Sequence, residues 1–188
     1  REAMGINDRV QLAQAAELMR ERINRRHMLN GVTLMDPKSI YIDWDVIIGR
    51  DAVIYPNNYL CSGSIIGQEC ILYEGNRLEK SRLGSGVSVR CSTLIEAEVG
   101  DSCTVGPNAY LRPKAVVGKN ARIGDFVELK NCSIGDKSKV SHLSYVGDAD
   151  VGSGCNIGCG VVFVNYDGKH KFRSRVGNNV FVGSNSNL

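Results

Sequence analysis

The chain has 188 residues, of which 43% are hydrophobic and 23% charged, and these ordinary globular values exclude disorder as the dominant state. Glycine is frequent, with 21 residues, but it does not recur at every third position, which excludes collagen. The net charge of +3 is too small to indicate nucleic acid or a membrane surface as a partner, and no apolar run approaches the roughly 18 residues that span a bilayer.

The first 30 residues predict one α-helix. Asn7 or Asp8 is expected to cap its start, and Asn30-Gly31 is a typical stop. Between them, apolar residues recur at helical spacing: Val10, Leu12, Ala13, Ala16, Met19 and Ile23. The basic segment 20–27 is expected to be a solvated helix end rather than a nucleic-acid site. The chain starts without a signal-peptide pattern at residues 1–5, so we expect a cytoplasmic protein.

From Ile48 onward, an aliphatic residue or once a phenylalanine recurs at intervals that are mostly six residues. These anchors are Ile48, Ile54, Leu60, Ile66, Leu72, Leu78, Leu83, Val89, Ile95, Val99, Val105, Leu111, Val117, Ile123, Leu129, Ile134, Val140, Val146, Val151, Ile157, Phe163, Val176, Val182 and Leu188. A period of six with glycine beside many anchors excludes a helix. It predicts an all-β domain over residues 48–188, a parallel β-helix in which three hexapeptides, about 18 residues, close each coil. Residues 31–47 are expected to be a connector.

Seven cysteines are present, an odd number without any C-x-x-C pair. A disulfide framework or a zinc knuckle is therefore not expected. The residue four positions after an anchor is usually small, as a tight coil corner requires, and Cys70, Cys103 and Cys155 occupy such positions. We expect these three to be buried, unreactive thiols.

Register converts the repeat into columns of residues. Leu111 and Leu129 are 18 positions apart and should stack inside, so Arg112 and Lys130 should stack outside, on strands ~4.8 Å apart. Like charges at adjacent strand positions repel, and an anionic ligand would relieve that repulsion. The alternative is two long side chains splayed into solvent.

His142 lies two residues after the anchor Val140, in a column that also holds Asp125 and Cys159. A histidine with a carboxylate in its column is a candidate general base at neutral pH. The one long interruption of the period, between Phe163 and Val176, places the segment 165–172 nearby, and solenoids often bind ligands at such insertions. A zinc carbonic anhydrase is the rival enzyme on this architecture, but it needs three histidine ligands, and His142 has no histidine neighbour in its coils.

The chain resembles the C-terminal half of the bacterial bifunctional N-acetylglucosamine-1-phosphate uridyltransferases/glucosamine-1-phosphate acetyltransferases. The motifs that carry the resemblance are 111-LRP-113, 126-FVELK-130, 142-HLSYVGD-148, 156-NIGCG-160, 165-NYDG-168, 171-KF-172 and 180-VFVGS-184. Residues 5–9, GINDR, resemble the end of the family's uridyltransferase domain, before its linker helix. The resemblance implies a left-handed parallel β-helix that uses acetyl-CoA.

Carried over by these motifs, His142 is the general base that takes a proton from the glucosamine amine. Five residues bind the sugar phosphate: Arg112, Lys130, Tyr145, Asn156 and Lys171. Four contact acetyl-CoA: Cys159, through its backbone, Asn165, Tyr166 and Ser184. Asn7 matches a position that helps hold Mg²⁺ and the sugar nucleotide in the uridyltransferase domain. Acetyl transfer itself needs no metal.

The family forms homotrimers, which we therefore expect here. The uridyltransferase domain is represented only by its last residues within 1–30, and the family has further coils beyond Leu188, so we expect an acetyltransferase domain that is truncated at its C-terminus. Two alternatives remain: another hexapeptide-repeat sugar acyltransferase, and a non-catalytic trimeric scaffold. The scaffold predicts that replacing His142 by alanine changes only local stability.

Overall fold

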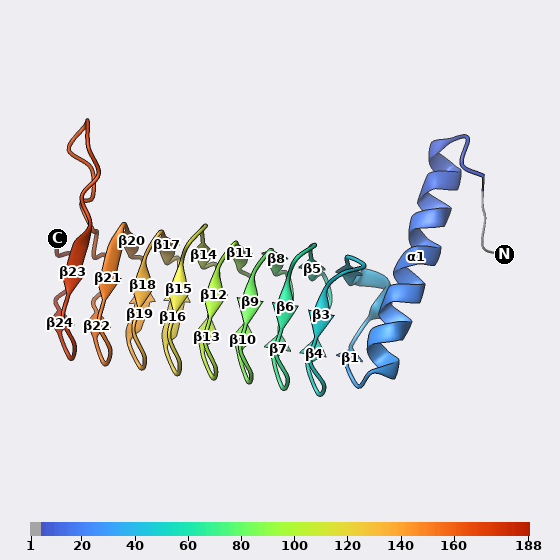
Figure 1. Ribbon diagram of the computed structural model, residues 1–188, viewed down its shortest axis with the longest axis horizontal. Coiled ribbons are helices and arrows are strands. Elements are labelled where there is room, and N and C mark those ends of the chain that lie inside the picture. The colour runs from blue at the N-terminus through green and yellow to red at the C-terminus, as the bar shows by residue number, and fades with distance from the viewer. Residues whose placement is uncertain (1–4) are drawn as a thin grey trace.

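The computed structural model describes residues 5–188 as one helix, α1 (Arg9–Leu29), followed by a straight β-solenoid with three parallel sheets (Figure 1). Residues 1–4, the start considered for a signal peptide, lie outside the described part. We call the sheets faces A, B and C. A 3₁₀-helix, Pro37–Ser39, lies before the second strand. Among the described residues, no helix is long and apolar enough to cross a membrane.

The strands succeed one another in the order A, B, C around each coil. Face A contains β1 (Thr33–Leu34), β4 (Val53–Ile54), β7 (Ile71–Leu72), β10 (Ser88–Val89), β13 (Thr104–Val105), β16 (Arg122–Asp125), β19 (Lys139–His142), β22 (Asn156–Ile157) and β24 (Phe181–Val182). Face B contains β2 (Tyr41–Ile42), β5 (Tyr59–Leu60), β8 (Arg77–Glu79), β11 (Thr93–Ile95), β14 (Tyr110–Leu111), β17 (Glu128–Lys130) and β20 (Tyr145–Gly147). Face C contains β3 (Ile47–Ile48), β6 (Ile65–Ile66), β9 (Arg82–Leu83), β12 (Glu98–Val99), β15 (Val116–Val117), β18 (Ser133–Ile134), β21 (Ala149–Val151) and β23 (Ser174–Val176).

Most of the predicted anchors form the core, because strands of successive coils pair in parallel and in register. One anchor is wrong by a residue: Leu94 is fully buried and pairs with Leu111, whereas Ile95 is half-buried and pairs with Glu79, because this coil is shorter than 18 residues. Leu188, the last predicted anchor, is 42% exposed. Leu111 pairs with Leu129 as expected, and both side chains are fully buried. Side chains alternate inward and outward along each strand, so the residues that flank an anchor face solvent. The predicted β-helix built from hexapeptides is confirmed.

The coil corners are filled by small residues, including the three cysteines predicted to be inside. Cys70, Cys103 and Cys155 are at most 1% exposed, and each thiol donates to a glycine carbonyl, for example Cys103 Sγ to Gly118 O at 2.8 Å. Burial raises the pKa of the Cys132 thiol to about 12, so this thiol is protonated at neutral pH. No cysteine within residues 5–188 forms a disulfide.

Glycine follows the anchor in every strand of face C, where each coil lies close to the next. The column consists of Gly49, Gly67, Gly84, Gly100, Gly118, Gly135, Gly152 and Gly177. A Cβ atom on any of the first seven would lie within 3 Å of an atom of the next coil, closer than real contacts allow. Gly177, on the last coil, has no atom of the described chain within 4 Å of that position. This column therefore sets the spacing of the coils.

Helix α1 begins and ends as predicted. The carboxylate of Asp8 accepts from Gln11 N at 2.8 Å, which caps the start, and the helix ends at Leu29 before Asn30. The apolar positions in its first half are exposed, Val10 by 67%. Only the second half packs on the solenoid, where the buried Asn24 amide donates to the carbonyls of Pro37 and Ile40.

The first coil begins earlier than the sequence period indicated. Strands β1 and β2, within the segment 31–47 predicted as a connector, pair with β4 and β5. Ile42 lies six residues before Ile48 and extends the period backwards, whereas Leu34 lies eight residues before Ile42 because the 3₁₀-helix intervenes. The domain boundaries themselves stay a prediction.

The junction between α1 and the solenoid is expected to weaken as the pH falls. His27 is only 4% exposed there; burial, and then the charge of Arg26, lower the pKa of its imidazole. At pH values between this lowered pKa and the ordinary value of about 6.5, the unfolded chain binds the proton and the folded chain does not. The free energy of unfolding therefore decreases as the pH falls, by at most about 1.4 kcal/mol per pH unit. Fluorescence of Trp44, the only tryptophan, reports on this junction because Arg26 donates to its carbonyl.

In urea titrations followed by Trp44 fluorescence, the midpoint should fall between pH 7.5 and pH 5.5. The variant His27→Gln should remove most of this dependence. His170→Gln is the matched control, since His170 lies exposed in a distant hairpin and should leave the dependence intact. A pH dependence that survives in His27→Gln would assign the effect to another group.

Candidate functional site

His142 and Asp125 form a pair at the corner between faces A and B. They end strands β19 and β16, in which they are directly paired, and His142 Nδ1 lies 2.6 Å from Asp125 Oδ1. A hydrogen bond from its own backbone amide and then the one from His142 lower the pKa of Asp125, so this side chain is a carboxylate at neutral pH. About half of the His142 side chain is exposed, and among the described residues its Nε2 has no hydrogen-bond partner. The predicted column of Asp125 and His142 is therefore present. Nδ1 of His142 is hydrogen-bonded to Asp125, and Nε2 is left without a partner among the described residues.

Two cations lie on the outer side of face B, as predicted, but one is already paired. The guanidinium of Arg112 donates to Glu128 Oε1 at 2.7 Å, which raises the pKa of Arg112. Within residues 5–188, Lys130 forms no ion pair. The repulsion expected between Arg112 and Lys130 is thus partly offset by Glu128, and Lys130 is the cation left for an anion.

The Tyr145 ring lies over Gly147, two residues along the same strand. Its hydroxyl oxygen is 2.2 Å from the position that a Cβ atom of residue 147 would occupy, so any larger residue there would displace the ring. The same hydroxyl accepts from Asn165 Nδ2 at 3.5 Å. Gly147 therefore lets Tyr145 point toward the long insertion.

That insertion, residues 164–173, is a hairpin that projects from the side of the solenoid near its C-terminal end (Figure 1). Tyr166 and Lys171 face each other as an antiparallel bridge, and Phe172 N donates to Asn165 O at 2.9 Å. Both legs are tied to the preceding coil. The first leg is held through Asn165, whose amide donates to the buried carboxylate of Asp148.

Asp148 is a buried charge with several partners. Burial alone would raise its pKa, but hydrogen bonds from Asn131 and Asn165, and then the charges of Lys130 and Lys171, lower it. Lys130, Lys171 and the Tyr145 hydroxyl therefore surround one polar cluster. The structure brings these three predicted substrate-binding residues together, between face B and the hairpin.

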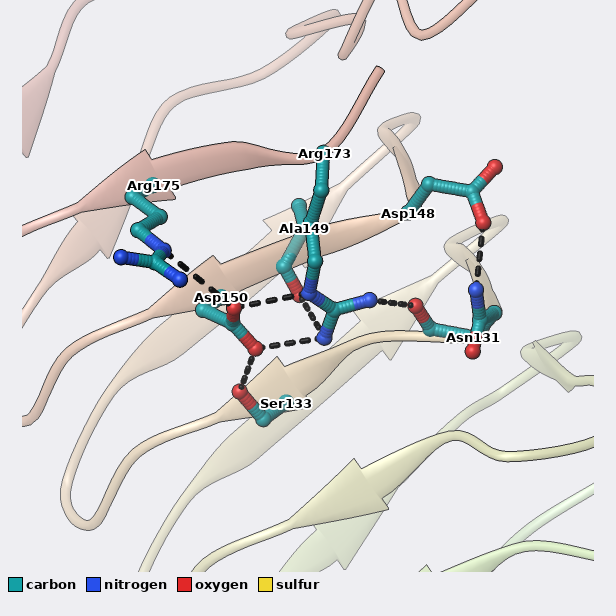
Figure 2. Close-up of polar contacts among 7 residues, drawn as sticks. All are labelled: Asn131, Ser133, Asp148, Ala149, Asp150, Arg173 and Arg175. Carbon is teal, nitrogen blue, oxygen red and sulfur yellow. Dashed lines mark hydrogen bonds and ion pairs between the residues drawn. The ribbon is translucent and has the colours of Figure 1, made fainter. Parts of the chain in front are cut away.

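The second leg is held by Arg173, as Figure 2 shows. Its guanidinium donates to both oxygens of Asp150, with Nε 2.7 Å from Oδ2, and to the carbonyls of Asn131 and Ala149. Asp150 also accepts from Ser133 Oγ at 2.7 Å. The bonds from Arg173 and then Ser133 lower the pKa of Asp150 well below its usual range, so this link persists at all moderately acidic pH values.

Replacing Arg173 by glutamine is expected to loosen the hairpin without unfolding the solenoid. Exposed ion pairs contribute roughly 0–1 kcal/mol to stability. We place this forked contact, which also includes two carbonyls, at the upper end of that range, because only 40% of the Arg173 side chain is exposed. We expect amide hydrogen exchange in residues 166–171 to accelerate about fivefold. The matched control is Arg175→Gln, which lies two residues later and approaches the same carboxylate only at 3.9 Å. Equal exchange in both variants would contradict this role.

The remaining predicted residues lie on both edges of face B and on face A. Cys159 and Ser184 continue the corner of His142 over the next two coils: Gly160 N donates to His142 O, and Asn185 N to Cys159 O. Asn165 and Tyr166 lie on the opposite edge, in the hairpin. Asn156 begins β22 and pairs with Lys139 on face A. Within a single copy of the chain, Asn156 therefore lies on a different face from Lys130 and Tyr145. The structure does not bring these predicted residues together.

Asn7 is exposed just before α1, where its backbone amide donates to Gln11 Oε1 at 2.7 Å. Mg²⁺ requires several oxygen ligands in an octahedral arrangement. The neighbouring Asp8 caps the helix, and residues 5–188 contain no cluster of three or more His, Cys, Asp or Glu that could hold a metal. These residues do not build a magnesium site by themselves, so the role of Asn7 stays a prediction.

Sequence reasoning assigned no role to Glu128, Asp148, Asp150 or Arg173. Glu128 and Asp148 lie within motifs of the resemblance, and the outward column next to that of Arg112 could have identified Glu128 as its partner. Arg173 carries no such signal, because the period is interrupted there. A cavity between α1 and the 3₁₀-helix, lined by Leu18, Met28 and Pro37, lies at the opposite end of the solenoid and contains none of the predicted site residues.

Comparisons with known proteins place these features in a family. The chain is 54% identical over 187 residues to the bifunctional protein GlmU of Clostridium beijerinckii and 56% identical to that of Clostridioides difficile; each alignment covers 100% of this chain and 41% of the relative. The chain thus spans less than half the length of the curated relatives it matches. The predicted resemblance to the bifunctional enzymes is confirmed.

The UDP-N-acetylglucosamine acyltransferase of Arabidopsis has a similar structure, with a TM-score of 0.57 and 16% identity over 80% of this chain and 67% of that one. At this identity the similarity concerns the fold alone. The family of the GMPPB C-terminal domain matches residues 93–186, which is half of the chain. The coils that carry Arg112, Lys130, His142 and the hairpin fall within this match, and the chain belongs to that family.

Proposed function

We propose that the chain transfers the acetyl group of acetyl-CoA to the amine of glucosamine-1-phosphate, with His142 as the general base. The observation that carries this proposal is the His142–Asp125 pair, which leaves Nε2 without a hydrogen-bond partner among the described residues, at the corner next to face B and its Lys130. In the full-length protein, whose relatives are more than twice as long, we further propose that a Mg²⁺-dependent uridyltransferase domain uses the product with UTP, in the cytoplasm.

The phosphate of the sugar is expected to bind at Lys130. Within the described chain this ammonium forms no direct ion pair, although its charge lowers the pKa of the nearby Asp148, and the hairpin that carries Lys171 lies beside it. Arg112 can contribute a second positive charge, but its hydrogen bond to Glu128 competes with a bidentate contact to phosphate. Tyr145, positioned over Gly147, can donate its hydroxyl to the sugar.

The chemistry requires a free lone pair on the attacking amine, which an ammonium lacks. The ammonium first loses one proton to solvent, which frees the lone pair. The nitrogen then forms a C–N bond to the acetyl carbon while Nε2 of His142 takes a second proton from that nitrogen, and the C–S bond breaks as the tetrahedral intermediate collapses. The departing CoA thiolate receives the proton from His142. No covalent acyl-enzyme is needed, so the buried cysteines have no role as nucleophiles. Binding the two substrates side by side supplies much of the remaining acceleration.

The location of Asn156 supports a homotrimer as part of this proposal. Asn156 is on face A and Lys130 on face B, so one copy cannot present both to a small sugar. If face A of a second copy lies against face B of the first, Asn156 can complete the site. Acetyl-CoA would then lie along the same corner, near Cys159, Ser184 and the hairpin residues Asn165 and Tyr166.

The test is formation of N-acetylglucosamine-1-phosphate, followed by chromatography because seven thiols interfere with thiol dyes. The chain and a longer version that covers the length of its relatives are assayed with glucosamine-1-phosphate and with glucosamine. We expect turnover only with the phosphorylated sugar. Lys130→Ala should raise KM for that sugar by about 10–100-fold, equivalent to about 1.4–2.7 kcal/mol.

The matched control is Lys137→Ala, an exposed lysine at the corner between faces C and A, opposite face B, and it should leave KM unchanged. Turnover with another acceptor sugar and none with glucosamine-1-phosphate would favour a different hexapeptide acyltransferase. Folded proteins that stay inactive with all acceptors, in both lengths, would overturn the enzyme proposal in favour of a scaffold.

A further inference from the structure

We infer that Asp125 is a positioning residue for the reaction: it holds the Nδ1–H of His142 so that the lone pair at Nε2 points away from the solenoid toward the substrate. This inference rests on the proposed acetyl transfer and assigns Asp125 a role within it. A neutral imidazole carries its proton on either nitrogen, and the hydrogen bond made by one nitrogen determines the state of the other. A carboxylate at Nδ1 can only accept, so it selects the tautomer in which Nε2 is a base.

The backbone is built to make this contact. On face A, β16 and β19 are each four residues long, whereas every other strand of that face has two. The additional residues extend the pairing up to Asp125 and His142 themselves. One position earlier, Gly124 is buried, and a Cβ atom on it would lie 2.0 Å from Ser141 O. The absence of a side chain at Gly124 therefore permits the close approach that brings the carboxylate to the imidazole.

Stability does not account for the pair. The side chains of Asp125 and His142 are 37% and 52% exposed, and exposed charge pairs contribute only roughly 0–1 kcal/mol. The two backbones are already joined by the strand pairing, so the solenoid does not depend on this contact. A hydrogen bond of 2.6 Å at a half-open corner is better explained by the orientation it imposes on His142.

The carboxylate also stabilises the imidazolium that exists while His142 carries the substrate's proton. Few other titratable side chains lie near His142 and Asp125. The titratable side chains of the adjoining elements are Arg122 on β16, Lys139 on β19, Tyr145 on β20 and Cys159 on the next coil. Arg122 adds a positive charge near Asp125, and Asp125 is the one carboxylate among them.

The experiment combines kinetics with a tautomer measurement on the full chain, using Asp125→Asn and Asp125→Ala. We expect kcat to fall about 10–100-fold with little change in either KM, the size of effect that follows when a metal-bound histidine loses its outer hydrogen-bond partner. Because the asparagine amide in Asp125→Asn can still accept from Nδ1 but carries no charge, the acidic limb of the kcat/KM profile should move to lower pH in that variant. Asp101→Asn, which removes a carboxylate paired with Lys119 at a different corner, is the matched control and should change neither quantity.

Nitrogen-15 NMR of the imidazoles separates this inference from the function on which it rests. In the wild-type chain, the His142 signals should report a protonated Nδ1, and in Asp125→Ala they should report both tautomers; His142→Gln assigns the signals. Unchanged tautomer and pH profile in Asp125→Ala, with normal turnover in the wild type, would overturn the positioning role and leave the acetyltransferase proposal standing. A tautomer change without wild-type turnover in either chain length would overturn the function, and with it the role of Asp125 in catalysis.

Discussion

Alanine in place of His142 is expected to lower the turnover of glucosamine-1-phosphate by about 10²–10⁴-fold while the β-solenoid stays intact. The imidazole is half exposed and contributes no packing to the core, so its removal should not unfold the coils. It is also the general base of the proposed reaction, so its removal leaves no group at this corner to take the proton from the attacking nitrogen. Turnover measured by chromatography, beside far-UV circular dichroism of the same sample, separates loss of chemistry from loss of fold.

His170→Ala is the control for a histidine that does not act as a base. Its ring lies in the hairpin, paired with Asp167 and 73% exposed, and it has no carboxylate in a strand column. It should retain turnover within about twofold. If His142→Ala and His170→Ala were equally active, the general base would have to be another group. The His142–Asp125 pair would then no longer support the proposed function.

The fold was predictable because a period of six residues determines geometry at every level. Once Leu111 and Leu129 occupy stacked anchor positions, the pairing of their neighbours follows without any knowledge of side-chain contacts. The same arithmetic places Asp125 beside His142, residues that are 17 positions apart because one turn of that coil is shorter by one residue. The corner that holds His142 and Asp125 was therefore predictable from the sequence, although the 2.6 Å contact was not.

Features that depend on side-chain direction or on the interrupted period were not predictable. A column identifies Arg112 and Lys130 as outward neighbours, but it does not say that Arg112 turns diagonally to Glu128. The hairpin has no repeat to define its legs, so Arg173 could not be recognised as the residue that anchors it. The helical spacing of apolar residues predicted α1 correctly, but not that its first half extends away from the solenoid and leaves Val10 exposed.

At the start of the first coil, a short 3₁₀-helix interrupts the six-residue period and makes the repeat hard to recognise in the sequence. Ile42 obeys the period, but the 3₁₀-helix beginning at Pro37 places Leu34 out of phase. The structure restores the stacking, since Leu34 pairs with Ile54 and Ile42 with Leu60. Coil length can therefore vary at a corner while the strand columns remain in register, which explains why intervals of five residues do not end the solenoid. The predicted interval of four, from Ile95 to Val99, is wrong because Leu94 is the buried anchor.

The glycine column of face C allows a direct test of this stacking. Replacing Gly67 by alanine is expected to lower the free energy of unfolding by about 1–3 kcal/mol, the usual cost of inserting a methyl group where no space exists. The new Cβ atom would lie 2.3 Å from Gly84 O and 2.8 Å from Ser85 N, and both are backbone atoms that cannot turn aside. Relief requires a local separation of two coils, which weakens the hydrogen bond from Gly67 N to Leu83 O.

The control is Gly177→Ala, which makes the same chemical change in the same column. No atom of the described chain lies within 4 Å of the new methyl group, and the backbone at Gly177 has no left-handed conformation that would penalise alanine. Thermal unfolding followed by circular dichroism should give a midpoint about 2–10 °C lower for Gly67→Ala and close to the wild type for Gly177→Ala. Because the two variants lose the same glycine entropy in the unfolded chain, a difference between them isolates the steric contact. Equal midpoints would mean that the coils can separate freely at Gly67, and that the glycine column does not set their spacing.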